Sequence, residues 1–138
     1  MADLGFIHCF EPRESASRTL LLLHGTGGDQ NDLLELGRAL DSQAALLSPR
    51  GKVLEGNAPR FFRRLAEGLF DEEDLVARAG ELSSFIDAAS VEYEFPIQNL
   101  TAVGYSNGAN IAAVDAATRY GEISFRRLIP RHASAVAD

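Results

Sequence analysis

The chain has 138 residues, of which 46% are hydrophobic and 24% are charged, and this globular composition predicts a single folded domain over 1–138. The net charge of −7 argues against a nucleic-acid partner and an anionic membrane surface, because both favour a basic patch. A single cysteine, Cys9, excludes an intramolecular disulfide and a cysteine zinc cluster. We expect a cytoplasmic protein, because the sequence has neither a signal-peptide pattern nor an apolar run near the roughly 20 residues of a membrane span.

The first predicted element is a strand at 19–25, TLLLLHG, a continuous apolar run that a glycine ends. Such a run is typical of a strand buried on both faces of a sheet. The stretch HGTGGDQND at 24–32 follows, and its glycines allow a sharp turn whose backbone amides can hold an anion. A nucleotide is the competing ligand, but neither G-x-x-x-x-G-K-[ST] nor G-x-G-x-x-G is present, so we expect no cofactor.

A helix is predicted at 31–41, behind the polar residues Asp29 and Asn31, with one apolar face: Leu33, Leu36 or Gly37, and Leu40. A second apolar strand is predicted at 44–51. The clearest helix is predicted at 71–93, where apolar residues recur every three or four positions: Leu75, Ala79, Leu82, Ile86, Ala89 and Tyr93. Its acidic first turn, 71–74, fits the positive end of a helix dipole better than a metal site, and Pro96 ends the helix.

A third apolar strand at 100–106 leads into GYSNG at 104–108, which has the pattern G-x-S-x-G. A serine at a strand-to-helix turn can be a nucleophile, and Gly104 and Gly108 fit there because larger side chains would collide with neighbouring backbone. The following helix points its amino end, with the Asn107 amide, at negative charge that forms beside Ser106. Alternating apolar strands and helices predict an α/β fold, a mainly parallel sheet with helices on both faces, with functional groups at the carboxyl ends of the strands.

Together these motifs resemble those of the α/β-hydrolase fold. Their residues resemble still more closely those of the phospholipase/carboxylesterase family of serine esterases. The resemblance covers about 19–113, in the pieces LLLLHGTGGDQNDLLELGRAL, ALLSPRGKV, PRFFRRLAEG, DEEDL and VGYSNGANIA. It implies a carboxylic-ester hydrolase that acts on a small-molecule ester through an acyl-enzyme. Ser106 resembles the nucleophile, and the backbone amides of Thr26 and Asn107 resemble an oxyanion hole.

Two further segments have a role that the resemblance leaves open. Phe61 and Phe62, in RFFRR at 60–64, resemble the wall of a substrate pocket. The alternative interpretation, which the sequence supports equally, is that 60–64 is an ordinary connection. Both rings would then pack into the core and the arginines would lie in solvent. His24 resembles a structural residue that bonds loop backbone more than it resembles a base.

The tail at 114–138 departs from the family, in which an acid and a histidine follow the serine. Asp115 falls where the helix should pack, and a strand predicted near 123–129 carries two arginines, which a central parallel strand seldom does. His132 is the histidine of this tail, but no acid is evident to orient it, because Asp138 is the last residue. We therefore expect the N-terminal portion of a hydrolase domain, shortened or altered in reading frame after about Ala113, that hydrolyses esters poorly or not at all.

Two alternatives stay open beside ester hydrolysis. One is an inactive fragment, or one that depends on a partner chain for its base and acid. The other is an acyltransferase that uses the same serine with an acceptor other than water. An interrupted sheet would leave an unpaired edge strand and exposed apolar helix faces, so we also expect a homodimer or a larger assembly.

Overall fold

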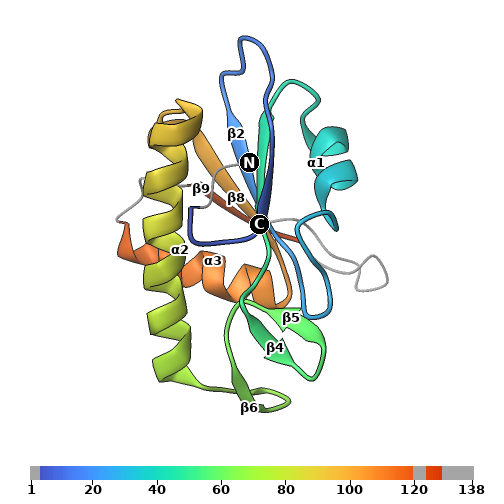
Figure 1. Ribbon diagram of the computed structural model, residues 1–138, viewed down its shortest axis with the longest axis vertical. Coiled ribbons are helices and arrows are strands. Elements are labelled where there is room, and N and C mark those ends of the chain that lie inside the picture. The colour runs from blue at the N-terminus through green and yellow to red at the C-terminus, as the bar shows by residue number, and fades with distance from the viewer. Residues whose placement is uncertain (1–3, 120–123, 129–138) are drawn as a thin grey trace.

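A five-stranded sheet forms the centre of the molecule (Figure 1). The computed structural model describes residues 4–119 and 124–128. The strands lie in the order β1-β3-β2-β8-β9, with the bounds β1 His8–Glu11, β3 Ala45–Pro49, β2 Thr19–Leu23, β8 Leu100–Tyr105 and β9 Ser124–Leu128. β3, β2, β8 and β9 are parallel, whereas β1 pairs antiparallel with β3. The predicted α/β class is confirmed. The three apolar runs of the sequence are β2, β3 and β8, and they are parallel neighbours in the sheet.

Helices cover both faces of this sheet, as the sequence predicts (Figure 1). α2 (Glu72–Tyr93) and α3 (Asn107–Thr118) pack on one face, and α1 (Leu34–Leu40) packs on the other. α2 follows the predicted spacing and buries Ala79, Leu82, Phe85, Ile86 and Ala89. The side chain of Asp71 accepts a hydrogen bond from the Asp74 N–H, so the acidic turn is the start of a helix. A short 3-10 helix, η1 (Ile97–Asn99), then leads into β8.

α1 is shorter than predicted and covers less of the sheet. It begins at Leu34 because Asp29 accepts a hydrogen bond from the Asn31 N–H, and turns occupy the residues before the helix. Gly37 is buried, but Leu40 is 50% exposed, so the predicted apolar face is only partly buried. A hollow of about 340 Å³ lies on this side of the sheet, lined by Arg18, Leu20, Leu40, Asp41, Thr101, Val103, Ser124, Arg126 and Leu128.

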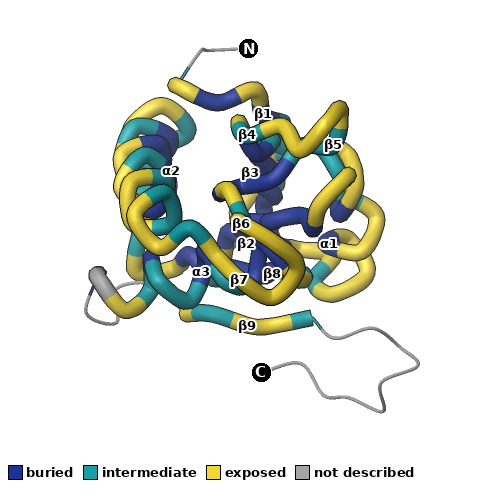
Figure 2. The backbone as a smooth tube through the Cα atoms, turned by 90° about the horizontal axis from the view of Figure 1, so that it is seen from below, coloured by how far each residue is buried: buried dark blue, intermediate teal, exposed yellow. Residues whose placement is uncertain are grey.

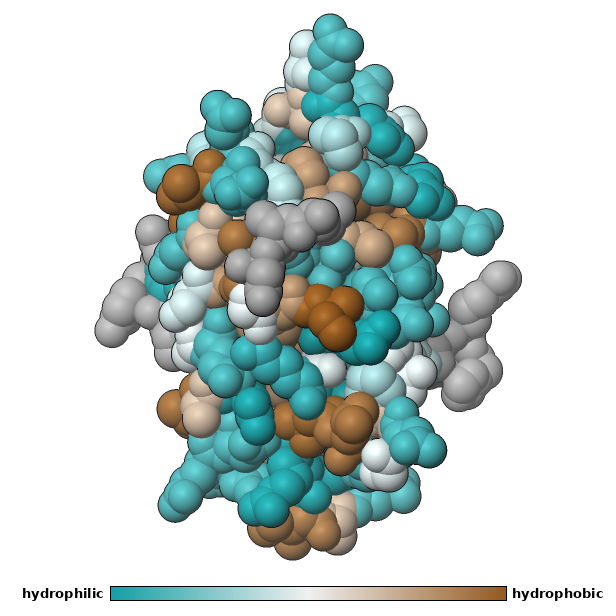
Figure 3. All heavy atoms as spheres, viewed as in Figure 1, coloured by the Kyte–Doolittle hydropathy of each residue, from teal (hydrophilic) through white to brown (hydrophobic). Residues whose placement is uncertain are grey.

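Two small hairpins lie between β3 and α2. One pairs β4 (Val53–Glu55) with β5 (Ala58–Arg60), and the other pairs β6 (Arg64–Ala66) with β7 (Leu69–Phe70). Several of their apolar side chains are exposed, among them Leu54, Leu65 and Leu69. The hairpins lie at the bottom of the view in Figure 1, and Figure 3 shows hydrophobic side chains on the surface of the same part of the molecule.

The segment after Ala113 contains the end of α3 and β9, which is the strand that the sequence predicts near 123–129. α3 runs on to Thr118 with Asp115 buried, because the Arg119 guanidinium lies beside that carboxylate. β9 then pairs with β8, and its arginines, Arg126 and Arg127, are exposed at the edge of the sheet (Figure 2). An edge strand tolerates charges because its side chains reach water, so the two arginines do not prevent pairing. In the described part of the chain, no helix is both long and apolar enough to cross a membrane.

Candidate active site

Ser106 lies at a tight turn between β8 and α3. It is the residue before the helix, it is exposed, and its backbone has φ 54° and ψ −115°. Residues with a side chain seldom adopt such a conformation, which costs on the order of 1–3 kcal/mol and is concentrated at functional sites. No described residue forms a hydrogen bond with the Ser106 hydroxyl. The turn thus presents an unpartnered hydroxyl at the carboxyl end of the sheet.

The glycines on either side of Ser106 allow this turn, for the steric reason that the sequence predicts. A Cβ on Gly104 would lie 2.6 Å from the Cα of Ala109, and one on Gly108 would lie 2.0 Å from the carbonyl oxygen of Leu23. Both distances are far below any real Cβ contact, so only glycine lets β8, α3 and the end of β2 approach so closely.

The loop after β2 lies beside Ser106. β2 and β8 are parallel neighbours, so the loops that follow them meet at one edge of the sheet. A Cβ built on Gly25 would lie 3.4 Å from the Ser106 Cβ. The backbone N–H groups of Thr26, in this loop, and of Asn107, at the start of α3, have no hydrogen-bond acceptor among the described residues. Two free donors therefore lie on segments that adjoin the serine.

His24 is a structural residue of this loop, as expected. Its side chain is buried, and its Nδ1 lies 2.6 Å from the Gly25 carbonyl oxygen. The Gly51 N–H donates to His24 Nε2 at 3.0 Å, so Nε2 carries no proton and Nδ1 is the donor. Burial lowers the pKa of His24 and favours this neutral form.

A third segment contacts both sides of the turn. It comprises residues 59–61, which are the end of β5 and the residue after it. The Gly27 N–H donates to the Pro59 carbonyl at 3.0 Å, and Arg60 Nη1 donates to Thr26 Oγ1 at 2.6 Å. The Phe61 N–H donates to the side-chain oxygen of Asn107 at 2.6 Å. The loop after β2 and the start of α3 are thus joined through one short piece of backbone.

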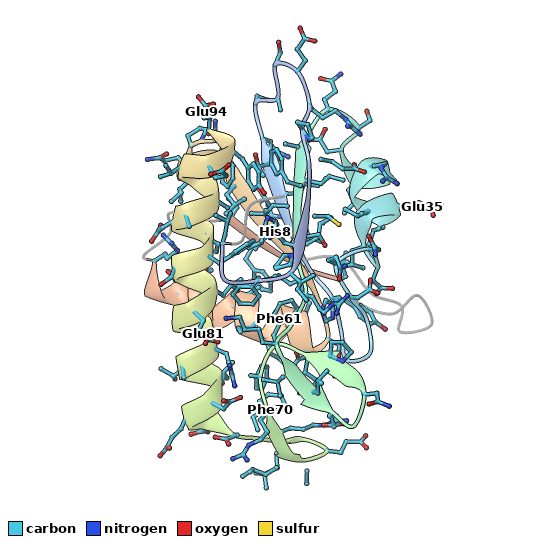
Figure 4. The ribbon with its side chains drawn as sticks, in the orientation of Figure 1. His8, Glu35, Phe61, Phe70, Glu81 and Glu94 are labelled. Carbon is cyan, nitrogen blue, oxygen red and sulfur yellow. The ribbon has the colours of Figure 1, made fainter. Side chains whose placement is uncertain are left out.

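The rings of Phe61 and Phe62 pack into the core. They are 2% and 0% exposed, and Phe61 lies toward the middle of the molecule, above Phe70 of the β6–β7 hairpin (Figure 4). Their role as a pocket wall stays a prediction. Arg60 differs from the expectation of solvated arginines, because it is 2% exposed. Sequence reasoning missed this burial, since RFFRR contains three arginines with no pattern that separates the buried one from the others.

Neither histidine of the described residues is placed as a general base for Ser106. His24 is engaged as above, and His8 lies within hydrogen-bond distance of the Phe6 carbonyl and the Tyr93 hydroxyl, at 2.8 and 2.6 Å. Neither histidine bonds Ser106. His132 and Asp138 lie outside the described residues. Within the described residues, no three His, Cys, Asp or Glu side chains gather where they could hold a metal ion.

Known proteins resemble this chain in sequence and in structure. No family model matches it. MhqD, a proposed hydrolase of Bacillus subtilis (strain 168), is 57% identical over 106 residues, which are 77% of this chain and 52% of MhqD. The Bacillus cereus carboxylesterase is 49% identical with a TM-score of 0.84, over 92% of this chain and 62% of that one. A carboxylesterase from Mesorhizobium loti is 25% identical with a TM-score of 0.81, over 91% and 62%. The chain thus spans about half to two thirds of the length of these proteins.

Proposed function

We propose that this chain, which has the α/β-hydrolase fold and is similar to solved carboxylesterases, is a carboxylic-ester hydrolase that works through an acyl-enzyme on Ser106. The observation that carries the proposal is the geometry of the serine. Ser106 combines a positive φ with an exposed, unpartnered hydroxyl, and it is flanked by the free N–H groups of Thr26 and Asn107. This arrangement supplies the nucleophile and the oxyanion donors that acyl transfer through a serine requires, and a base has to be added to it.

In the proposed reaction, the Ser106 hydroxyl oxygen attacks the carbonyl carbon of an ester and gives up its proton to a base. The carbonyl oxygen becomes an oxyanion that accepts hydrogen bonds from the Thr26 and Asn107 amides. Collapse of this tetrahedral intermediate breaks the carbon–oxygen bond to the alcohol. The alcohol leaves with the proton, and the acyl group stays on Ser106. Water then attacks the acyl-enzyme, releases the acid and restores the hydroxyl. Each such amide contributes about 3–4 kcal/mol to the transition state.

The base and the acid of this mechanism have to come from outside the described residues. His132 is one candidate, a partner chain is a second, and sequence beyond this chain, which spans 62% of the Bacillus cereus carboxylesterase, is a third. What supports a source outside the described residues is that both described histidines are engaged with groups other than Ser106. Without a base, binding and oxyanion stabilisation give about 10³-fold over water, so slow turnover by this chain is the expected result.

The test is acylation and turnover of a short-chain chromogenic ester by purified protein of confirmed mass. We expect an acyl adduct on Ser106 by intact mass and peptide mapping, with the adduct and turnover lost in Ser106→Ala. Ser84→Ala, an exposed serine of α2, is the matched control and should keep both. His132→Ala separates the two sources of the base. If the wild-type chain is neither acylated nor active, it is not a hydrolase by itself.

A further inference from the structure

Arg60 carries a buried charge that stability alone does not explain. Its side chain is 3% exposed, and its nearest carboxylate, on Glu55, lies 4.0 Å away. Arg64 takes that carboxylate at 2.6 Å in a bidentate pair, so Arg60 shares a partner that is already engaged. A buried charge without close pairing costs several kcal/mol, and an apolar side chain of similar volume is often neutral or stabilising in such a place. The presence of a guanidinium at this buried position is therefore better explained by the groups to which it donates hydrogen bonds.

The guanidinium of Arg60 holds two oxygens in a fixed fork. Nε donates to the Phe62 carbonyl at 2.8 Å, and Nη1 donates to Thr26 Oγ1 at 2.6 Å. The first bond turns the side chain toward the residues that follow β5 and fixes its direction, and the second holds the Thr26 side chain. Because arginine is planar and stays protonated, both bonds share one rigid group at any physiological pH.

The Thr26 loop needs such an anchor because glycines surround it. Gly25 and Gly27 flank Thr26, Gly28 follows, and Gly27 has φ +89°. Glycine loses more conformational freedom on ordering than any other residue, so the Thr26 amide is poorly fixed by its own backbone. The only side chain within 25–28 belongs to Thr26, and its hydroxyl is the atom that Arg60 binds.

We propose that Arg60 is a positioning residue, which with the backbone of segment 59–61 sets the Thr26 and Asn107 amides at a fixed separation for the oxyanion. The inference rests on the proposed function and names a residue which that function does not use. Segment 59–61 reaches Gly27 and Thr26 on one side and Asn107 on the other. Gly51 allows the segment to pack closely against it, because a Cβ on Gly51 would lie only 2.3 Å from the Arg60 carbonyl carbon.

The first arm of the test is kinetic. Arg60→Met should lower kcat for a short-chain ester about tenfold or more, with KM within about twofold, because misplaced donors weaken the transition state and leave ground-state binding alone. Arg64→Met, on the neighbouring β6–β7 hairpin and with the same acidic partner, should match wild-type. Thr26→Val removes the acceptor and keeps the amide, so it should resemble Arg60→Met, and the double variant should be no worse than either single one. Equal kinetics in Arg60→Met and wild-type would overturn the proposal.

The second arm does not depend on activity. Hydrogen exchange at the Gly27 amide, which donates to Pro59, should speed up about tenfold in Arg60→Met and Thr26→Val, while amides of β2 and β8 keep their rates. An increase spread evenly over the sheet, or no increase at Gly27, would overturn the proposal. If Arg60→Met does not fold, Thr26→Val removes the same bond from an exposed residue and decides the question. If the wild-type chain shows no turnover, the proposed function fails, and exchange alone decides whether Arg60 positions this loop.

Discussion

Asp115 in the last turn of α3 and Arg119, the residue that follows the helix, form a buried ion pair in which Oδ2 lies 3.7 Å from Nε. Arg119 also reaches α2, where its Nη2 lies 2.7 Å from Asp87 Oδ1 and 2.9 Å from the Ser83 carbonyl oxygen. The guanidinium therefore fastens the end of α3 to the neighbouring helix. This connection lies after Ala113, in the segment where the sequence predicts a departure from the family.

Asp115 should make stability fall as the pH rises from about 4 to 6.5. Burial raises the pKa of Asp115 to about 6, against the ordinary 3.8, with Arg119 opposing the shift and Asp87 adding to it. The folded state therefore binds the proton more tightly than the unfolded state, so ionisation costs about 2–3 kcal/mol, fully incurred above the folded pKa. Asp115→Asn should abolish this component. Urea unfolding at several pH values checks it, and a wild-type-minus-variant difference that stays flat from pH 4 to 7 would contradict it.

Ser106→Gly and Ser106→Ala should differ in stability although neither can be acylated. Alanine keeps the Cβ and hence the strain of φ 54°, whereas glycine adopts that conformation freely. We expect Ser106→Gly to be more stable than Ser106→Ala by about 1 kcal/mol, after glycine's greater unfolded-state entropy is subtracted. Thermal unfolding of the two variants measures the difference. Equal or reversed stability would mean that the turn is not strained at this residue.

Gly108→Ala should destabilise the fold far more than an equivalent change elsewhere. The added methyl would lie 2.0 Å from the Leu23 carbonyl oxygen, so α3 has to move away from β2, at a cost of at least about 1–3 kcal/mol. The matched control is Gly80→Ala in α2, where no described atom beyond the neighbouring residues and the local helix backbone lies within 4 Å of the new methyl. That change should stabilise the protein by about 0.5–1 kcal/mol. Denaturant midpoints decide, and a Gly108→Ala protein as stable as wild-type would be incompatible with this packing.

His24 should be neutral at pH 7, with its proton on Nδ1. Because burial lowers its pKa below the ordinary 6.5, the folded state resists protonation, and stability is lost as the pH falls through the ordinary value. Nitrogen-15 spectra of the imidazole report both the tautomer and the titration. Protonation of Nε2 at pH 7 would contradict the hydrogen bond from Gly51.

The elements that the sequence predicts well are those whose signal is local. The runs at β2, β3 and β8 are apolar throughout, and α2 has a long regular period, so each identifies itself without its neighbours. Gly104 and Gly108 are predictable for a similar reason, since the steric demand of a tight turn can be read from adjacent residues.

The features that the sequence does not predict depend on distant partners. The strand β1 reads HCFE, which has no continuous apolar run, and it is a strand because β3 lies beside it. Arg60 is buried because Thr26, 34 residues away, accepts its hydrogen bond. Arg119, which lies beside the buried Asp115, is held by Asp87 of α2, 32 residues away in the sequence. No pattern of neighbouring residues shows where such a partner lies.

The pairing of β2 with β8 also governs how the site comes into being during folding. Thr19 pairs with Leu100, 81 positions later in the chain. Closing so long a loop costs entropy before any contact repays it, and parallel pairings of this kind form slowly. Until then the Thr26 loop and Ser106 are parts of separate, unorganised segments, and TLLLL is open to other chains. Acquisition of an oxyanion-binding geometry should therefore coincide with the slowest folding step, and low temperature or chaperones during synthesis should raise the yield of competent protein.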